Sequence, residues 1–218
     1  MKIAVIGTGS VGGALGRRWS EVGHEVEFGS RDPQSEKVQQ LLGESNGNLR
    51  ATDIRSAMES AEVIVLAVPW PEVGKTLGAV EDLNDKVIID CTNPINAQFD
   101  GLDLGFSESA GEKIAELAPG ARVVKAFNTI SSATMADPHY ADHAATVFYC
   151  GDDDAAKEIV HQLCEELGLD AVDAGPLKTS RYLEPLAWLY IQLAIKHGWG
   201  SNCAFKILQR EKPTSQDS

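Results

Sequence analysis

Three glycines near the amino terminus have a spacing that suits the binding of phosphate groups. Gly7, Gly9 and Gly12, in the stretch GTGSVGGAL, fit the pattern G-x-G-x-x-G between an apolar run and a helical pattern. The first glycine permits a tight turn, the second lets a diphosphate approach the backbone, and the third allows close packing of helix and strand. Amide N–H groups at the start of the helix complete a predicted dinucleotide site.

The end of the second apolar run indicates which dinucleotide is bound. In sites for an unphosphorylated adenosine ribose, an acid at this point accepts hydrogen bonds from the 2′-hydroxyl. The stretch HEVEFGSRDP has Gly29, Ser30 and Arg31 instead. Gly29 leaves space, while the Ser30 hydroxyl and the Arg31 guanidinium suit phosphate oxygens. Lys37 adds a positive charge if the following helix turns it inward. These residues predict NADP, and the alternative is a surface arginine after a strand.

Two further strand ends carry residues that are placed to line the nicotinamide. The run VIVLAVPWPEV ends in Val68, Pro69 and Trp70, and the run before DCTNP leads to Asn93 and Pro94. In open parallel sheets, ligands bind beyond the carboxyl ends of the strands, where the strand order reverses. We therefore expect these residues on the nicotinamide side. The competing interpretations are a packing aromatic for Trp70 and an ordinary turn for Asn93 and Pro94.

Residue types that carry acid–base or metal chemistry are sparse. Lys125, in RVVKAFNTI, and His161 are the candidates for moving a proton, and a snorkelling or capping lysine is an equal alternative for Lys125. His139 and His143 have i, i+4 spacing without a nearby third ligand, so we interpret them as surface residues. We predict no catalytic acid or base and no metal site.

Apolar runs rich in Val and Ile alternate with helical patterns along the chain. This alternation predicts an α/β protein with a Rossmann-type, doubly wound and mainly parallel sheet, covered by helices on both faces. The predicted strands are Lys2–Ile6, Glu25–Phe28, Leu49–Ala51, Glu62–Val68, Lys86–Cys91, Arg122–Ala126, Thr146–Cys150 and Asp170–Asp173. The predicted helices are Val11–Val22, Glu36–Leu42, Ile54–Ser60, Val73–Val80, Ala110–Leu117, Ala155–Leu167 and Ser180–Lys196.

The pattern divides the chain into three parts. We expect residues 1–174 to form an NADP-binding Rossmann domain, and residues 175–210 to form a short C-terminal helical extension. The extension is strongly apolar, so we expect it to complete the acceptor site and to form the interface of a homodimer. Residues 211–218, EKPTSQDS, are polar and predict a disordered tail. The Gly- and Asp-rich segment 96–109 predicts a loop across the site.

Composition excludes several classes of partner. The 218 residues include 19 Lys and Arg against 32 Asp and Glu, for a net charge of −13, which argues against nucleic acid and anionic membranes. No apolar run approaches the length of a membrane span. Cys91, Cys150, Cys164 and Cys203 form no C-x-x-C pair, which favours free thiols in a reducing compartment. We therefore expect a cytoplasmic protein that acts on a small molecule.

Several stretches, in order and with similar spacing, resemble one known family. They are GTGSVG, GHEVEFGSRD, VPW, KAFNTI, YCGDDDAAK and DAGPLKTSRYLEPL. The chain resembles, over nearly its full length, the NADP oxidoreductases that depend on coenzyme F-420 (8-hydroxy-5-deazaflavin). That family transfers a hydride directly between the nicotinamide C4 and the deazaflavin C5. The resemblance implies a deazaflavin near Asn128, Thr129, Ile130 and Leu177, and NADP among Thr8, Gly9, Ser10, Val11, Ser30, Arg31, Trp70, Asn93 and Ser132.

One position departs from that family and leaves the acceptor open. Its archaeal members carry a histidine before Thr-Ile, where this chain has Asn128. The stretch VVKAFN also resembles the cytosolic domain of six-transmembrane metalloreductases, which pass electrons from NADPH through a flavin to ferric or cupric ions. We expect an NADPH-dependent oxidoreductase that uses the deazaflavin. The alternatives are a flavin-linked or ferric reductase and a non-catalytic NADP-binding redox sensor.

Overall fold

The computed structural model describes residues 1–43 and 48–210, so the predicted disordered tail, residues 211–218, lies outside the described residues. Within these ranges eight strands form one sheet and two short strands form a separate hairpin. The sheet contains β1 (Lys2–Ile6), β2 (Glu25–Gly29), β3 (Leu49–Thr52), β4 (Val63–Leu66), β5 (Val87–Asp90), β6 (Arg122–Ala126), β9 (Thr146–Gly151) and β10 (Asp170–Asp173). The hairpin consists of β7 (His139–Tyr140) and β8 (His143–Ala144).

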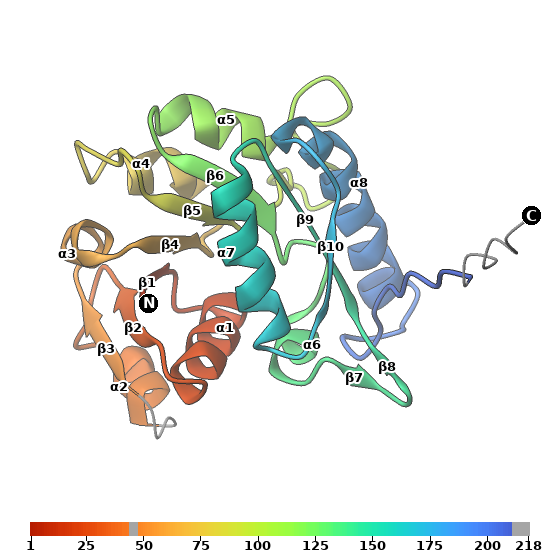
Figure 1. Cartoon of the computed structure of the whole chain (residues 1–218), viewed down its shortest axis with the longest axis horizontal. Coiled ribbons are helices and arrows are strands. Elements are labelled where there is room, and N and C mark those ends of the chain that lie inside the picture. Colours follow the sequence, from red (N-terminus) through yellow and green to blue (C-terminus); the bar gives the residue numbers. More distant parts are fainter. Residues whose placement is uncertain (44–47, 211–218) are drawn as a thin grey trace, which may run out of the picture.

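The strand order is that of a doubly wound dinucleotide-binding sheet. Strands β3-β2-β1-β4-β5-β6 lie side by side in this order, and all five pairs are parallel (Figure 1). The order reverses between β1 and β4, which places the crevice at the carboxyl ends of these two strands. β9 pairs with β6 in the antiparallel direction and carries β10 parallel to itself. The predicted fold class, a mainly parallel Rossmann-type sheet, is confirmed.

Helices cover both faces of the sheet because its central strands are apolar on both sides. In β1, Ile3 and Val5 belong to one hydrophobic cluster, and Ala4 and Ile6 belong to the other. The first cluster includes residues of α1, α2, α6 and α7, and the second includes residues of α3, α4 and α5. These helices are α1 (Ser10–Glu21), α2 (Glu36–Gly43), α3 (Ile54–Ser60), α4 (Val73–Leu77), α5 (Ala110–Leu117), α6 (Ser132–Ala136) and α7 (Asp154–Glu165).

Two short 3₁₀ helices and a long helix complete the described chain. They are η1 (Trp70–Glu72), η2 (Leu177–Thr179) and α8 (Ser180–Ile191), and α8 continues into a π-helical turn, Gln192–Lys196. The predicted helix Ser180–Lys196 is therefore present, with its last turn widened. Figure 1 shows α8 in blue, at one end of the molecule and next to the carboxyl-terminal segment. Its packing against α5 fixes its place on the sheet domain.

The segment 96–109 is a loop, as predicted, and it lies against α8. Asn96 organises its first turn, because its side-chain oxygen accepts hydrogen bonds from the backbone N–H groups of Asp100 and Gly101. The ring of Phe99 meets the ring of Trp188 edge to face, with the centroids 5.8 Å apart. The loop and α8 therefore form one continuous surface.

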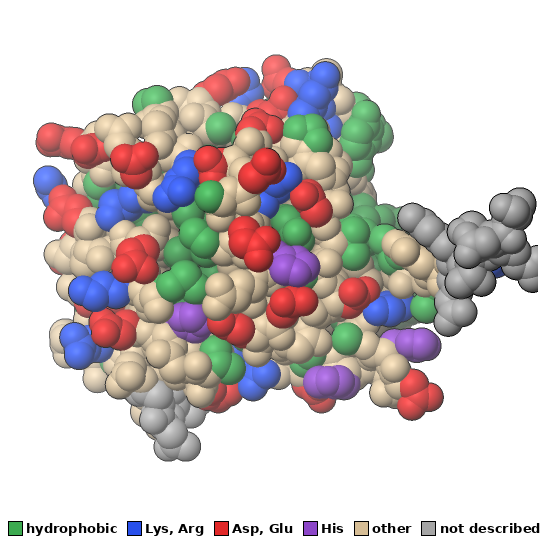
Figure 2. Space-filling model, in the orientation of Figure 1, with side chains coloured by type: hydrophobic (Ala, Val, Ile, Leu, Met, Phe, Trp, Pro, Cys, Tyr) green, Lys and Arg blue, Asp and Glu red, His purple; other side chains and the backbone are tan. Residues whose placement is uncertain are grey.

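Charged side chains of both signs are mixed over the face that α7 covers. Figure 2 shows acidic, basic and histidine side chains interspersed on this face, without a continuous run of Lys and Arg. This distribution agrees with the strongly negative net charge of the sequence. It offers no extended positive surface for a phosphate backbone on this side of the molecule.

Candidate functional site

A cavity of about 560 Å³ opens at the carboxyl ends of β1, β2 and β4, where the strand order reverses. Eight of the predicted cofactor-binding residues line it. They are Gly7, Thr8, Gly9, Ser30, Arg31, Lys37, Val68 and Pro69. The fold therefore brings predicted residues from three separate parts of the chain to one cavity at this edge.

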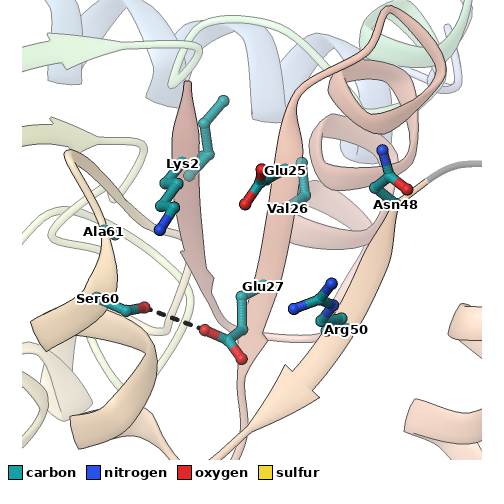
Figure 3. Close-up of a pocket in the computed structure, with 9 residues that line it drawn as sticks. Lys2, Glu25, Val26, Glu27, Asn48, Arg50, Ser60 and Ala61 are labelled. Atoms are coloured by element: carbon teal, nitrogen blue, oxygen red, sulfur yellow. Dashed lines mark hydrogen bonds between the residues drawn. The ribbon is translucent and has the colours of Figure 1, made fainter.

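A second cavity, of about 250 Å³, lies at the opposite edge of the same strands. Figure 3 shows its lining, with Lys2, Glu25, Glu27 and Arg50 near the amino ends of β1, β2 and β3. The Ser60 hydroxyl donates a hydrogen bond to Glu27 across it. Ligands of doubly wound sheets bind at the carboxyl ends, so we place the functional site in the first cavity.

The glycine motif has the geometry that a dinucleotide requires. Gly7 has a φ of +118°, and an added Cβ there would overlap the carbonyl oxygen of Ala67. At Gly12 an added Cβ would overlap the carbonyl oxygen of Gly7, so helix and strand pack too closely for a side chain. At Gly9 an added Cβ would meet nothing within 4 Å. The open space at Gly9 is where a diphosphate can approach the backbone.

The amino end of α1 is equipped to bind an anion. Its N-cap residue, Gly9, makes no side-chain capping hydrogen bond, whereas Ser109 caps α5 and Asp153 caps α7 through their side chains. The first N–H groups of a helix need an acceptor, and the helix dipole favours a negative charge there. The 12-residue α1 therefore presents N–H donors to a phosphate in the cavity.

The end of β2 presents the residues predicted for a 2′-phosphate. The Ser30 hydroxyl oxygen accepts a hydrogen bond from the N–H of Asp32 and keeps its own proton to donate. The Arg31 side chain is 77% exposed. At Gly29 an added Cβ would lie 2.5 Å from Cδ1 of Ile6, so glycine is also required there by packing. The guanidinium is thus exposed to the cavity, where a phosphate can reach it.

The wall of this cavity that follows β4 was not predicted from the sequence. Glu72 lines it from η1, Lys75 and Thr76 line it from α4, and Ala79 lines it from the turn after α4. Their spacing of three and four residues places them on one helix face, and this spacing is a signal that the sequence could have offered. Lys75 adds a cation to a site for which only Arg31 and Lys37 were predicted. The other lining residues that were not predicted are Ile6, Asp32, Ile54 and Ala67.

A second group of predicted residues meets beside this cavity, at the ends of β5 and β6. The Asn128 amide nitrogen donates to Oδ1 of Asn93 at 3.0 Å and to the carbonyl oxygen of Leu183 at 3.1 Å, and Asn93 donates to the Asn128 carbonyl oxygen at 3.1 Å. Both N–H groups of Asn128 are therefore used, which fixes the orientation of its amide. Its Oδ1 and the Thr129 hydroxyl are buried without a partner among the described residues.

The backbone just before Asn128 adopts a left-handed conformation. The buried Phe127, between β6 and Asn128, has a φ of +63°. A left-handed conformation is costly for a residue with a side chain, and such residues concentrate at functional sites. The two unpaired polar atoms that follow this residue need a hydrogen-bonding partner, because an unsatisfied buried group is costly. A polar group of a bound ring is one such partner.

The remaining predicted residues do not line the cavity. Ser10 and Val11 lie in the first turn of α1, and Gly12 packs on Gly7. Trp70 begins η1, where it is partly buried against the second core cluster. Pro94 follows Asn93. Ile130 is buried in the first core cluster, Leu177 is buried in the second, and Ser132 is the first residue of α6.

Lys125, the first acid–base candidate, is neither a snorkelling nor a capping lysine. Its side chain is completely buried, and its Nζ lies 2.5 Å from Oδ2 of Asp90 and 2.9 Å from Oε1 of Glu184. It also donates to the Thr92 carbonyl oxygen. Burial alone would lower the pKa of Lys125, but the two carboxylates raise it above its ordinary value. The ammonium keeps its proton, so Lys125 is a structural cation.

His161, the second candidate, lies outside the cavity. It is on α7, where Nδ1 lies 3.2 Å from the Tyr149 hydroxyl and Nε2 lies 3.4 Å from Oε1 of Glu165. His139 and His143 are exposed in the β7–β8 hairpin. Within residues 1–43 and 48–210, no three His, Cys, Asp or Glu side chains are placed to hold a metal ion. No helix of that part is long and apolar enough to cross a membrane.

Comparisons with known proteins show the family of this chain. The family model for coenzyme F420-dependent NADP oxidoreductases matches residues 2–94, which include the glycine motif and both walls of the cavity. The F420-dependent NADP reductase of Methanothermobacter thermautotrophicus is 33% identical over 214 residues, covering 90% of each chain. The chain belongs to the F420-dependent NADP reductase family. It is an NADP-dependent oxidoreductase, and NADP and coenzyme F420 are the cofactors of this family.

Two further comparisons give one relative from each of the two families that the sequence resembles. The crystal structure of a candidate F420-dependent NADP reductase from Arthrobacter sp. FB24 has a TM-score of 0.86 and 31% identity, and covers 96% of this chain and 100% of that one. Metalloreductase STEAP3 of Rattus norvegicus is 30% identical over 186 residues, which is 85% of this chain but 36% of that protein. The matches to the two F420-dependent reductases cover nearly the full length of both chains, whereas this chain spans about a third of the length of the metalloreductase.

Proposed function

We propose that this protein transfers a hydride between NADP(H) and coenzyme F420. The observation that carries the proposal is the cavity at the switch point, where Arg31, Ser30 and Lys37 stand in place of a ribose-binding acid. Family membership supplies the acceptor, because similar proteins are named for F420. The uncapped start of α1 and the open space at Gly9 fit the diphosphate of this cofactor.

The residues of the cavity would bind and orient the cofactor. The N–H groups at the start of α1 donate to the diphosphate, and the Arg31 guanidinium and the Ser30 hydroxyl bind the 2′-phosphate. Val68 and Pro69 then direct the rest of the molecule towards the ends of β5 and β6. When bound, the nicotinamide C4 supplies a hydride that the deazaflavin C5 accepts.

The pair Asn93 and Asn128 would position the rings. The hydrogen bonds between Asn93 and Asn128, and the one from Asn128 to Leu183, fix the Asn128 amide and leave its Oδ1 able to accept a hydrogen bond from a ligand. Thr129 offers a hydroxyl next to it. We assign Ile130, Ser132 and Leu177 to the surroundings of the acceptor. Hydride transfer between stacked rings needs such positioning and no protein acid or base, and effective positioning contributes ~7–11 kcal/mol to catalysis.

A comparison of electron acceptors tests this function. NADPH should reduce coenzyme F420 in a reaction followed by the absorbance of the deazaflavin, and the turnover number should exceed that with free flavin or a ferric chelate. Higher turnover with flavin or with the ferric chelate would favour the metalloreductase-like function. NADPH binding without turnover of any acceptor would favour a redox sensor.

We further propose that residues 175–210 complete the acceptor site and hold two chains together. Large apolar side chains on and after α8 are exposed, among them Tyr182 (65%), Ile195 (63%) and Trp199 (64%). Exposed apolar surface of this kind marks interfaces. Light scattering should give twice the mass of one chain, and Ile195→Glu should shift the population towards monomers. The mass of one chain at every protein concentration would contradict the dimer.

A further inference from the structure

An ion pair spans the cofactor cavity. Arg31 follows β2, and Glu72 ends η1, which follows β4. Nη1 of Arg31 lies 3.9 Å from Oε2 of Glu72, and both residues line the same cavity. The carboxylate therefore stands beside the guanidinium that we assign to the 2′-phosphate. The 2′-phosphate of NADP is negatively charged, so a carboxylate beside its proposed binding residue would repel it.

The surroundings of Glu72 leave its carboxylate available to a ligand. Its side chain is 45% exposed, and Arg31 is the partner that the structure gives it. Asp32, the other acid of the cavity, accepts the N–H of Gln34 in its own turn. Lys75, one helical turn after Glu72, lines the same wall. Glu72 is thus the acid that faces Arg31 across the opening.

We propose that Glu72 is a specificity-determining residue that limits the preference of this cavity for NADPH over NADH. The inference rests on the proposed place of the 2′-phosphate at Arg31. A 2′-phosphate must draw the guanidinium away from Glu72, and its charge is repelled by the carboxylate. A 2′-hydroxyl has no charge and can donate a hydrogen bond to the carboxylate. Glu72 therefore weakens NADPH binding and leaves NADH binding unchanged or stronger.

Binding of the two cofactors to one variant tests this role. Glu72→Gln should bind NADPH about two- to tenfold more tightly, because the pair and the ligand are partly exposed and screened. NADH should bind equally or more weakly, so the ratio of the two dissociation constants rises. The gain for NADPH should shrink between ~0.01 M and ~0.15 M ionic strength. Glu72→Asp keeps the charge and should stay closer to the wild type.

Controls separate this inference from the proposed function. Glu116→Gln removes the same charge from an exposed site on α5 outside the cavity, and it should change neither affinity. Two results would overturn the role of Glu72. One is that Glu116→Gln changes the NADPH affinity as much as Glu72→Gln does. The other is that Glu72→Gln changes the affinities for NADPH and NADH equally. Arg31→Ala, measured alongside, should weaken only NADPH binding. If Arg31→Ala weakens the binding of both cofactors equally, the proposed place of the 2′-phosphate is wrong. If Arg31→Ala weakens only NADPH binding and Glu72→Gln changes the binding of both cofactors equally, only the role of Glu72 is wrong.

Discussion

Replacing Lys125 with methionine is expected to lower the free energy of unfolding by about 3–5 kcal/mol. The side chains are similar in volume, so the loss comes from charge. Without the ammonium, the carboxylates of Asp90 and Glu184 remain buried together, although each has other hydrogen-bond donors. Burial already raises the pKa of Glu184 above its ordinary value, with Lys125 opposing the rise. Removing one partner of such a pair leaves an uncompensated charge.

The position of this ion pair makes it a support for the site. Glu184 accepts the N–H groups of Ala110 and Gly111 at 3.0 and 3.1 Å, which joins α8 to the start of α5. The preceding residue, Leu183, accepts a hydrogen bond from Asn128. Lys125 therefore holds the helix that fixes the Asn128 amide. Loss of the Lys125 ion pair is therefore expected both to destabilise the fold and to loosen the part of α8 that orients Asn128.

Denaturant unfolding with matched variants measures the effect. Lys113→Met removes a partly exposed lysine that pairs with Glu116, and it should leave the midpoint nearly unchanged. Lys125→Met combined with Glu184→Gln should be less destabilising than the sum of the two single changes, because the second change removes one of the stranded charges. A loss below about 1 kcal/mol for Lys125→Met would show that the buried carboxylates do not need this cation.

Replacing Arg31 with alanine is expected to weaken NADPH binding about 10- to 100-fold and to leave NADH binding nearly unchanged. A hydrogen bond to a charged group contributes roughly 1.5–3 kcal/mol, and the exposed position of Arg31 places its value towards the lower end. The Arg31 side chain lies at the end of β2 and lines the cavity beside Ser30 and Lys37. Only NADPH carries the phosphate that this guanidinium would bind.

Titration calorimetry with both cofactors distinguishes this role from a general effect. Arg55→Ala is the matched control, because Arg55 is an exposed arginine of α3 outside the cavity lining. It should change neither dissociation constant. Equal losses for NADPH and NADH in Arg31→Ala would place the 2′-phosphate elsewhere, with Lys37 and Lys75 as the next candidates.

The fold could be predicted because its signals are local. The strands β1, β4 and β5 are continuous apolar runs, the glycine motif lies between a strand and a helix, and their combination has few arrangements. The direction of β9 could not be predicted, because an apolar run reads the same in a parallel and an antiparallel strand. The short helix α6 was missed because its five residues are fewer than two helical turns.

Candidate site residues that belong to a sequence motif could be predicted. Those that are positioned by contacts between distant parts of the chain could not. Gly9 and Arg31 follow strand ends, and both line the cavity at the switch point. Glu72 and Lys75 lie beyond the strand end, on η1 and α4, and their helical spacing indicates a shared face without indicating that this face lines the cavity. The partners of Lys125 are 35 and 59 residues away, so its burial as an ion pair depends on the packing of α8. Such contacts are properties of the folded chain.

The fate of a deuterium label tests direct hydride transfer to coenzyme F420 most directly. NADPH is labelled stereospecifically at the nicotinamide C4 and mixed with the enzyme and oxidised coenzyme F420, and the reduced deazaflavin is then examined by mass spectrometry. Direct transfer to C5 predicts one deuterium atom per reduced deazaflavin, without exchange with solvent, from one of the two C4 positions. Loss of the label to water, or oxidation of NADPH only when free flavin or a ferric chelate is present, would contradict the proposed reaction.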